Sequence, residues 1–136
     1  MQAQGGKNLA ANPAPGFKLR PDHKVKCDLY RGDVIVSLEG TEIARSASAV
    51  LVTESDHRPI LYMPQSDVHD EFLIESRHVT RCPFKGKARY WNVKIEDHEV
   101  DNAVWAYEMP YDEVLELAGL MAFYETKLDI EVIPAN

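Results

Sequence analysis

The stretch CPFKGKARYW, residues 82–91, combines a turn with the beginning of a strand. Pro83 fixes the backbone angle φ directly after Cys82. Gly86 has no side chain, so another part of the chain can approach the backbone closely at this point. We therefore expect a bend near Lys85 that leads into a strand over residues 87–95.

Alternation along this strand separates two kinds of side chain, because successive residues of a strand point to opposite faces. If the strand starts near Lys85, one face carries the cations and a tryptophan: Lys85, Lys87, Arg89 and Trp91. The other face carries Gly86, Ala88 and Tyr90. The two small residues leave space beside the Tyr90 ring, which makes this second face a candidate wall of a ligand pocket.

Apolar residues at every second position predict further strands on both sides of this stretch. The predicted strands cover residues 25–29, 34–38, 41–44, 49–54, 60–63, 103–107, 120–124 and 128–133. Turn-forming residues such as Gly32 and Pro59 separate them. The sequence therefore predicts a mainly antiparallel β domain of packed sheets with one or two short helices.

Two segments are expected to be helical. Ser66 or Asp67 can cap a single helical turn within residues 64–73. Pro110 suits the first turn of a second helix that Gly119 can end. The inward side of that second helix would carry Val114, Leu117 and Ala118.

Length and composition fit one domain in a soluble chain. The 136 residues are 45% hydrophobic, which is ordinary for a globular protein. Residues 1–23 are rich in Gly, Ala and Pro and predict a flexible tail, followed by a single domain over 24–136. Residues 1–22 contain no apolar run of the kind that a signal peptide needs, and charged residues interrupt every apolar stretch. We therefore expect a cytoplasmic protein that does not span a membrane.

The charge balance argues against general binding to nucleic acid or to anionic membranes. Lys and Arg number 15 against 22 Asp and Glu, a formal net charge of −7. Residues 76–95, however, contain six basic residues and no acidic one. An acidic protein can thus keep one local contact for an anion, and the partner we expect is a small molecule. The sequence leaves the oligomeric state open.

No metal or cofactor is predicted. The two cysteines, Cys27 and Cys82, lie far apart and neither belongs to a C-x-x-C pair, so the sequence encodes no zinc knuckle. The five histidines are scattered along the chain. Asp67 and His69 have the spacing of two metal ligands, but no third ligand lies in register with them.

Aromatic residues suggest the leading functional hypothesis. Trp105 and Tyr107 share one face of their predicted strand, and with Tyr90 they can clamp a planar group. Lys85 beside Gly86 is the expected anion contact, and Tyr62 and Arg89 complete the candidate ligand-binding set. The hypothesis is therefore a pocket for a planar, anionic metabolite or nucleotide-like ligand. The competing interpretation is that the rings fill the core and the cations pair with the acidic surface.

Two other classes of function stay open. In the first, the protein is an enzyme in which Cys82, surrounded by cations that favour its thiolate, acts as a nucleophile or redox thiol. Glu54 or Asp67 is then a candidate general base, although Glu54 is also a natural partner for Arg45 or Lys85 and Asp67 for a helix N-terminus. In the second, the acidic face around Glu113 and Glu116 binds another protein.

Several motifs together resemble one known family. They are Ile43-Ala44-Arg45-Ser46 leading to Glu54, Tyr62-Met63-Pro64 with Asp67-Val68, and the stretch from Cys82 to Trp91, followed by Ala103-Val104-Trp105-Ala106-Tyr107, Pro110, Ala118-Gly119 and Ala122-Phe123-Tyr124. In this order, from about Val34 to Ile130, they resemble the domain of unknown function 427 family. Arg45 departs from the family pattern, which usually carries an acid there.

The resemblance implies a β-tent-like architecture, similar to methionine-R-sulfoxide reductases and to the drug-binding domain of cereblon. Several relatives with that architecture bind zinc through paired Cys-x-x-Cys knuckles, which this sequence lacks. The family also carries a label that suggests nucleotidyl transfer, but a shared fold does not by itself transfer a reaction.

Overall fold

The structure is a computed structural model that describes residues 11–136. Its strands are β1 (Val25–Leu29), β2 (Gly32–Leu38), β3 (Thr41–Ser46), β4 (Val50–Glu54), β5 (Ile60–Pro64), β6 (Leu73–Cys82), β7 (Gly86–Ile95), β8 (His98–Ala106), β9 (Leu120–Phe123) and β10 (Asp129–Pro134). The helical segments are the α-helix α1 (Gly16–Leu19) and the 3-10 helices η2 (Gln65–Asp67), η3 (Asp70–Phe72) and η4 (Asp112–Leu117). Within the described part of the chain, no helix is both long enough and apolar enough to cross a bilayer.

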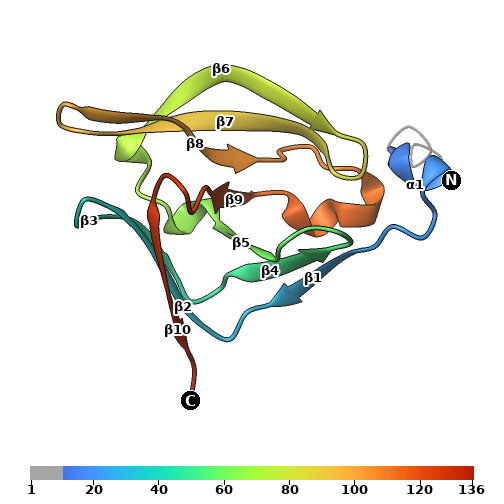
Figure 1. The fold of residues 1–136 in the computed structure, drawn as a ribbon, viewed down its shortest axis with the longest axis horizontal. Coiled ribbons are helices and arrows are strands. Elements are labelled where there is room, and N and C mark those ends of the chain that lie inside the picture. The colour runs from blue at the N-terminus through green and yellow to red at the C-terminus, as the bar shows by residue number, and fades with distance from the viewer. Residues whose placement is uncertain (1–10) are drawn as a thin grey trace, which may run out of the picture.

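The strands form two antiparallel sheets (Figure 1). The larger sheet has seven strands in the order β1-β4-β5-β9-β8-β7-β6, and the smaller has three in the order β10-β2-β3. In Figure 1 the larger sheet runs from β6 and β7 at the top to β4 and β1 near the bottom, with the smaller sheet at the left. The predicted mainly β fold of packed antiparallel sheets with only short helices is confirmed.

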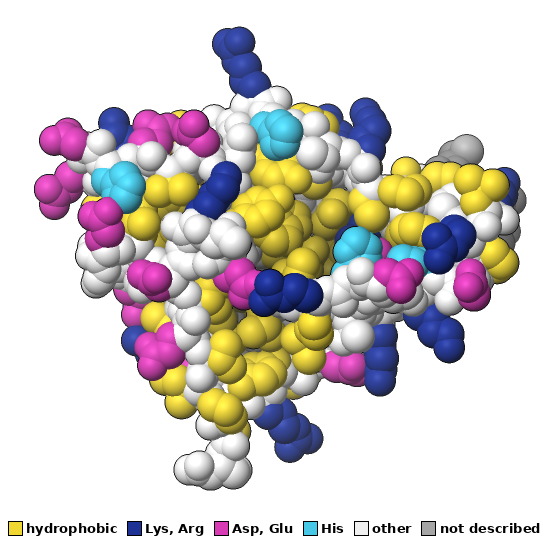
Figure 2. All heavy atoms as spheres, in the orientation of Figure 1, with side chains coloured by type: hydrophobic (Ala, Val, Ile, Leu, Met, Phe, Trp, Pro, Cys, Tyr) yellow, Lys and Arg dark blue, Asp and Glu magenta, His cyan; other side chains and the backbone are white. Residues whose placement is uncertain are grey.

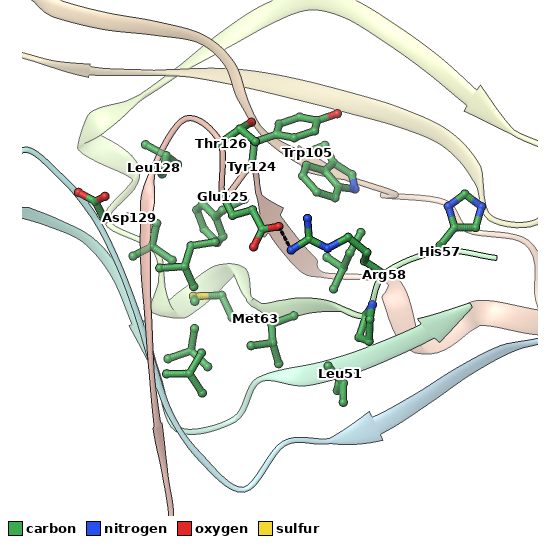
Figure 3. A pocket seen from close by; sticks show the side chains of 18 of the residues that line it. Leu51, His57, Arg58, Met63, Trp105, Tyr124, Glu125, Thr126, Leu128 and Asp129 are labelled. Atoms are coloured by element: carbon green, nitrogen blue, oxygen red, sulfur yellow. Dashed lines mark ion pairs between the residues drawn. The ribbon is translucent and has the colours of Figure 1, made fainter. Parts of the chain in front are cut away.

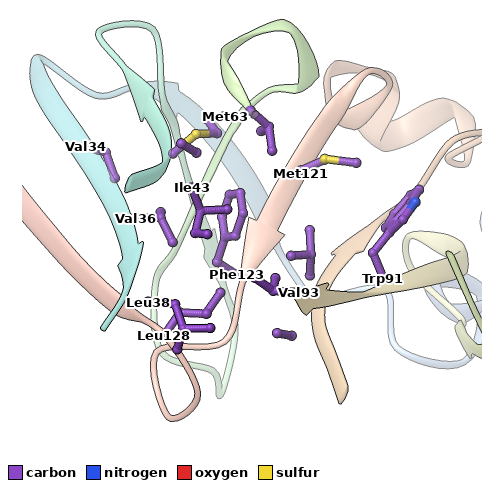
Figure 4. Close-up of a cluster of buried hydrophobic side chains, with 14 of the residues drawn as sticks. Val34, Val36, Leu38, Ile43, Met63, Trp91, Val93, Met121, Phe123 and Leu128 are labelled. Atoms are coloured by element: carbon purple, nitrogen blue, oxygen red, sulfur yellow. The ribbon is translucent and has the colours of Figure 1, made fainter. Parts of the chain in front are cut away.

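The main core lies between the two sheets (Figure 4). Alternate residues of the smaller sheet, such as Val36 and Ile43, meet alternate residues of the larger one, such as Val93, Met121 and Phe123. All five are buried. Fully burying an aliphatic or aromatic side chain of this size contributes about 1.5–3 kcal/mol, so this layer holds the sheets together.

The opposite face of the larger sheet carries a second cluster of buried side chains. It gathers Val52, Tyr62, Ala88, Tyr90, Trp105, Tyr107, Val114, Leu117 and Ala122. Half-buried Cys27 and Cys82 also pack against it, and they lie on β1 and β6, the two edge strands of this sheet. The sheet therefore curls around this cluster, and η4 covers it through Val114 and Leu117.

The sequence did not predict β6, the strand that pairs with β7. Most residues of β6 are exposed, and its register with β7 shifts between Glu75 and Val79. An exposed edge strand with a bulge has no alternating apolar face, and this alternation is the pattern from which strands are read. The single helical turn expected within residues 64–73 is instead the pair η2 and η3, followed directly by this strand.

The helix predicted between Pro110 and Gly119 is wrong in type. The structure has the 3-10 segment η4, which Val114 interrupts with φ −134° and ψ 37°. Two side chains of η4 bind the segment before α1: the Asp112 carboxylate accepts from the backbone N–H of Asn12, and Glu113 accepts from Ala14. These tertiary hydrogen bonds hold the segment where a continuous α-helix was expected. The predicted inward side is correct for Val114 and Leu117, which are buried, and wrong for Ala118, which follows the last residue of η4 and is exposed.

Residues 11–23, which were expected to belong to a tail, contact the domain. Ala14, Gly16 and His23 are buried. The Gly16 N–H donates to the carbonyl of Pro83 at 2.9 Å. Residues 1–10 of the expected tail lie outside the described residues.

Candidate ligand-binding site

Four side chains form a row across the second face of the larger sheet. Tyr90 on β7 pairs in register with Trp105 on β8. Trp105 pairs in turn with Ala122 on β9, and Ala122 pairs with Tyr62 on β5. Register partners share a face and lie about 5 Å apart between Cβ atoms. The small Ala122 side chain separates the two large rings, and the Trp105 indole N–H reaches over it to donate to the Tyr62 hydroxyl oxygen at 3.3 Å. Tyr107 extends the row along the chain from Trp105.

The tyrosine hydroxyls on this face lie in buried or hydrogen-bonded positions. The Tyr90 hydroxyl forms a hydrogen bond of 2.9 Å with that of Thr80. Burial raises the pKa of Tyr62 and of Tyr107 above the ordinary tyrosine value. Burial and the neighbouring Tyr90 hydroxyl raise the pKa of Tyr124 to about 12. At neutral pH Tyr62, Tyr107 and Tyr124 therefore carry neutral hydroxyls, which can donate and accept hydrogen bonds.

A cavity of about 890 Å³ opens beside this row. Trp105 and Tyr124 are the aromatic residues of the cluster that border it, and their ring centroids lie 4.4 Å apart. Figure 2 shows hydrophobic side chains gathered in a hollow near the middle of this view of the molecule. The cavity therefore gives a ligand access to the edge of an otherwise closed aromatic cluster.

The cavity extends around the end of β5 to the other face of the sheet. Pairing of β5 with β9 begins only at Tyr62, so Ile60 and Leu61 of β5 have no partner on β9. These two neighbours point to opposite faces, and both line the cavity. An ion pair between Arg58 and Glu125 spans the cavity where it passes between these two faces (Figure 3). Its nitrogen and oxygen atoms, Arg58 Nη2 and Glu125 Oε1, lie 2.5 Å apart. The cavity thus reaches both the aromatic face and the space between the sheets.

Lys85, the expected anion contact, lies in an ion pair. Its ammonium donates to Glu54 at the end of β4, and the other oxygen of Glu54 accepts from His23 Nε2 at 2.8 Å. The side chains of Lys85, Glu54 and His23 are 8%, 9% and 5% exposed. These three residues are called the Glu54 cluster below.

Local backbone contacts explain why Lys85 points inward. The residue belongs to the turn before β7, where its N–H donates to the carbonyl of Cys82 and its own carbonyl accepts from Tyr111. Gly86, the next residue, has a φ of 126°, which residues with a side chain rarely adopt, so glycine permits the backbone of this turn. The expectation that Lys85 shares a strand face with Lys87 and Arg89 is wrong, because strand alternation does not extend into the turn.

Glu54 is ionised in this setting. Burial opposes its ionisation, but the hydrogen bonds from Lys85 and His23 outweigh burial and lower the pKa of Glu54. The negative charge of Glu54 therefore compensates the positive charge of Lys85. A carboxylate with a lowered pKa that already accepts two hydrogen bonds is a weak general base, so the geometry favours the predicted pairing of Glu54 with Lys85 over catalysis.

The segment before β1 covers the Glu54 cluster. The His23 ring stacks on Phe84 of the turn, with centroids 3.8 Å apart, and Phe17 meets Phe84 edge-on at 5.0 Å. His57 lies near the same carboxylate, with Nε2 3.8 Å from Glu54. His23 was not singled out from the sequence because it falls in the expected tail.

Two other predicted site residues lie away from the aromatic row. Arg89 sits on the opposite face of β7, where it pairs with Glu75 and Glu108 and lies over the Trp91 ring. Asp67 does not cap a helix; its carboxylate accepts from the Ser46 hydroxyl at 2.6 Å.

The remaining predicted residues have structural neighbours of their own. Cys82 is half-buried at the end of β6, and Cys27 lies on β1, where burial raises the pKa of its thiol. On the acidic face proposed for protein binding, the Glu113 carboxylate accepts a hydrogen bond from the backbone N–H of Ala14. Among residues 11–136 no group of three or more His, Cys, Asp and Glu side chains is placed to hold a metal ion.

Sequence reasoning named Trp105 as a site residue but missed the other residues that line the cavity. Tyr124 follows Phe123 at the end of β9; the sequence placed it in a predicted strand and in the motif Ala122-Phe123-Tyr124, but not in a site. Arg58 and Glu125 lie in loops far apart in the sequence, so their pairing depends on the order of the strands.

Comparison with known proteins identifies the family. A search of curated proteins finds no match. The family model described as a domain of unknown function, DUF427, matches residues 26–133. Because this match covers most of the chain, and covers the aromatic row, the cavity and the turn at Lys85, the protein belongs to the DUF427 family.

Proposed function

We propose that the protein binds a small planar ligand against the Trp105 and Tyr124 rings. The observation that carries this proposal is the cavity of about 890 Å³ that borders both rings. Ligand pockets are typically about 300–1,000 Å³, mostly apolar, with a few polar groups that orient the ligand. The Arg58 guanidinium and the Glu125 carboxylate, which both line the cavity, are such groups.

The charges around the cavity favour a neutral ligand over the anionic one expected from the sequence. Among the residues that the structure describes, the carboxylates of Asp56, Glu125 and Asp129 line the cavity, against one guanidinium, that of Arg58. Lys85 is neutralised by its ion pair and does not line the cavity. An anion would therefore meet a net negative rim.

The expected affinity is modest. Stacking on an aromatic side chain contributes about 1–3 kcal/mol, and a hydrogen bond to a charged group about 1.5–3 kcal/mol. Loss of ligand freedom on binding opposes these gains. These gains total at most about 6 kcal/mol before that cost, so we expect a dissociation constant in the millimolar range, which corresponds to about −4 kcal/mol.

Calorimetric titration with 2-naphthamide, a neutral planar probe, tests the proposal. We expect Tyr124→Ala to weaken binding at least about tenfold, because the ring that faces Trp105 is lost, and Tyr124→Phe to retain it. Tyr30→Ala is the matched control, since Tyr30 is half-buried against the main core and does not line the cavity. The proposal is refuted if wild-type protein does not bind the probe, or if Tyr30→Ala weakens binding as much as Tyr124→Ala.

A further inference from the structure

The cavity has a second, aliphatic arm, and we infer that the ligand carries an alkyl chain joined to its planar ring by a neutral polar group. This inference rests on the proposed function, because the ring is the part that lies against Trp105 and Tyr124. It adds the chemical class of the ligand: an N-alkyl aryl amide or a close analogue.

The aliphatic arm lies between the two sheets. Its walls are side chains from β2, β4, β5 and β10, among them Val34, Val36, Leu51, Leu61, Met63 and Val132. These residues offer no hydrogen-bond partner, so this arm suits methylene groups and disfavours a second polar ring. Both arms belong to one cavity, because neighbouring residues Ile60 and Leu61 line it from opposite faces of β5.

The junction of the two arms specifies the polar group. In Figure 3 the ion pair of Arg58 with Glu125 lies between the Trp105 and Tyr124 rings and the side chains of Met63 and Leu51. A guanidinium only donates hydrogen bonds and a carboxylate only accepts them. An amide carries both complementary groups: its carbonyl accepts from Arg58 and its N–H donates to Glu125. A charged linker would instead be repelled by one member of the pair.

The ion pair between Arg58 and Glu125 is exposed enough to share its hydrogen bonds with a ligand amide. The side chains of Arg58 and Glu125 are 81% and 56% exposed. Exposed ion pairs contribute little, about 0–1 kcal/mol, so a ligand can share their hydrogen bonds at small cost.

A series of 2-naphthamide, N-propyl-2-naphthamide and N-hexyl-2-naphthamide tests the inference by calorimetry. Each fully buried methylene tightens binding about fourfold. We therefore expect N-hexyl-2-naphthamide to bind wild-type protein at least about tenfold more tightly than the propyl compound. Equal affinities of the propyl and hexyl compounds would overturn the inference.

Two variants separate binding in the aliphatic arm from general hydrophobic adhesion. Val132→Trp fills the arm from β10, whereas Ile133→Trp places the same ring on the other face of that strand; the two residues are 40% and 43% exposed. The gain from propyl to hexyl should disappear in Val132→Trp and persist in Ile133→Trp. Leu51→Phe, which narrows the arm from β4, repeats the test if Val132→Trp does not fold.

The outcomes distinguish the two proposals. If 2-naphthamide binds but the chain brings no gain, or the same gain in Val132→Trp, the alkyl inference is wrong and the proposed function stands. If only the hexyl compound binds, and Val132→Trp abolishes this binding, the aliphatic arm is supported and the aromatic site is wrong. Absence of binding by all three compounds overturns both.

Discussion

Glu54 joins two residues that each lie 31 positions away in the sequence, His23 and Lys85. Such a separation cannot be read from local patterns, although the sequence offered Lys85 as one of two partners for this carboxylate. The pair is buried, so each charge depends on the other for compensation. Lys85 therefore has a structural role and is not the free anion contact that the sequence predicted.

Replacement of Glu54 should therefore destabilise the fold. Glu54→Gln leaves the Lys85 ammonium buried without a counter-charge, and the free energy of unfolding at pH 7 should fall by about 3 kcal/mol. Urea denaturation measures this change. Glu125→Gln is the control, because its ion pair with Arg58 is exposed and its loss should cost less than about 1 kcal/mol. Equal effects of the two substitutions would argue against a buried Glu54 cluster.

The same cluster predicts a pH dependence. The pKa of Glu54 is lower in the folded protein than its ordinary value of 4.5. Its stabilising contribution is thus present above pH 4.5 and is lost as the pH falls through the folded pKa. The difference in unfolding free energy between wild type and Glu54→Gln should shrink as the pH is lowered from 5 towards 3. A difference that stays constant over this range would contradict the assignment.

At the scale of elements, the turn before β7 and the segment around α1 support each other. A Cβ atom at Gly16 would lie 2.6 Å from a ring carbon of Phe84. Gly16→Ala should therefore push α1 away from the turn and lower the free energy of unfolding by about 1–3 kcal/mol. Trypsin should also cleave after Lys18 faster in this variant, whereas Pro21 blocks cleavage after Arg20.

The control for this prediction lies in the same helix. Leu19 is 86% exposed, so Leu19→Ala should leave both the unfolding free energy and the rate of cleavage nearly unchanged. If Gly16→Ala behaves like Leu19→Ala, the segment does not cover the Glu54 cluster as the structure has it.

The strands that could be predicted are those with one buried and one exposed face. β2 and the first half of β7 alternate clearly, and the sequence predicted both. β6 is an exposed edge strand whose pairing depends on β7, so its own residues carry little pattern. The segment η4 buries Val114 and Leu117 as predicted but leaves Ala118 exposed, and it is not the predicted helix type. Its Asp112 and Glu113 side chains make tertiary hydrogen bonds, which local patterns do not reveal.

At the scale of the whole molecule, the sequence predicted part of the candidate site. Trp105 and Tyr107 were expected on one face, and they share the second cluster. The contact of Trp105 with Tyr62, however, requires β9 to lie between β8 and β5, and the cavity requires β5 and β9 to separate beyond Tyr62. Strand order and strand separation are properties of the assembled sheets, and residue patterns do not encode them locally.

The chain contains two tryptophans, and this gives the most direct test of the proposed site. Trp105 borders the cavity, whereas Trp91 packs in the core between the sheets. Their indole N–H signals can be followed in a two-dimensional ¹H–¹⁵N NMR spectrum during titration with 2-naphthamide, with Trp91→Phe to assign them. We expect a saturable shift of the Trp105 signal and an unchanged Trp91 signal. An unchanged Trp105 signal, or equal shifts of both, would contradict the proposed site.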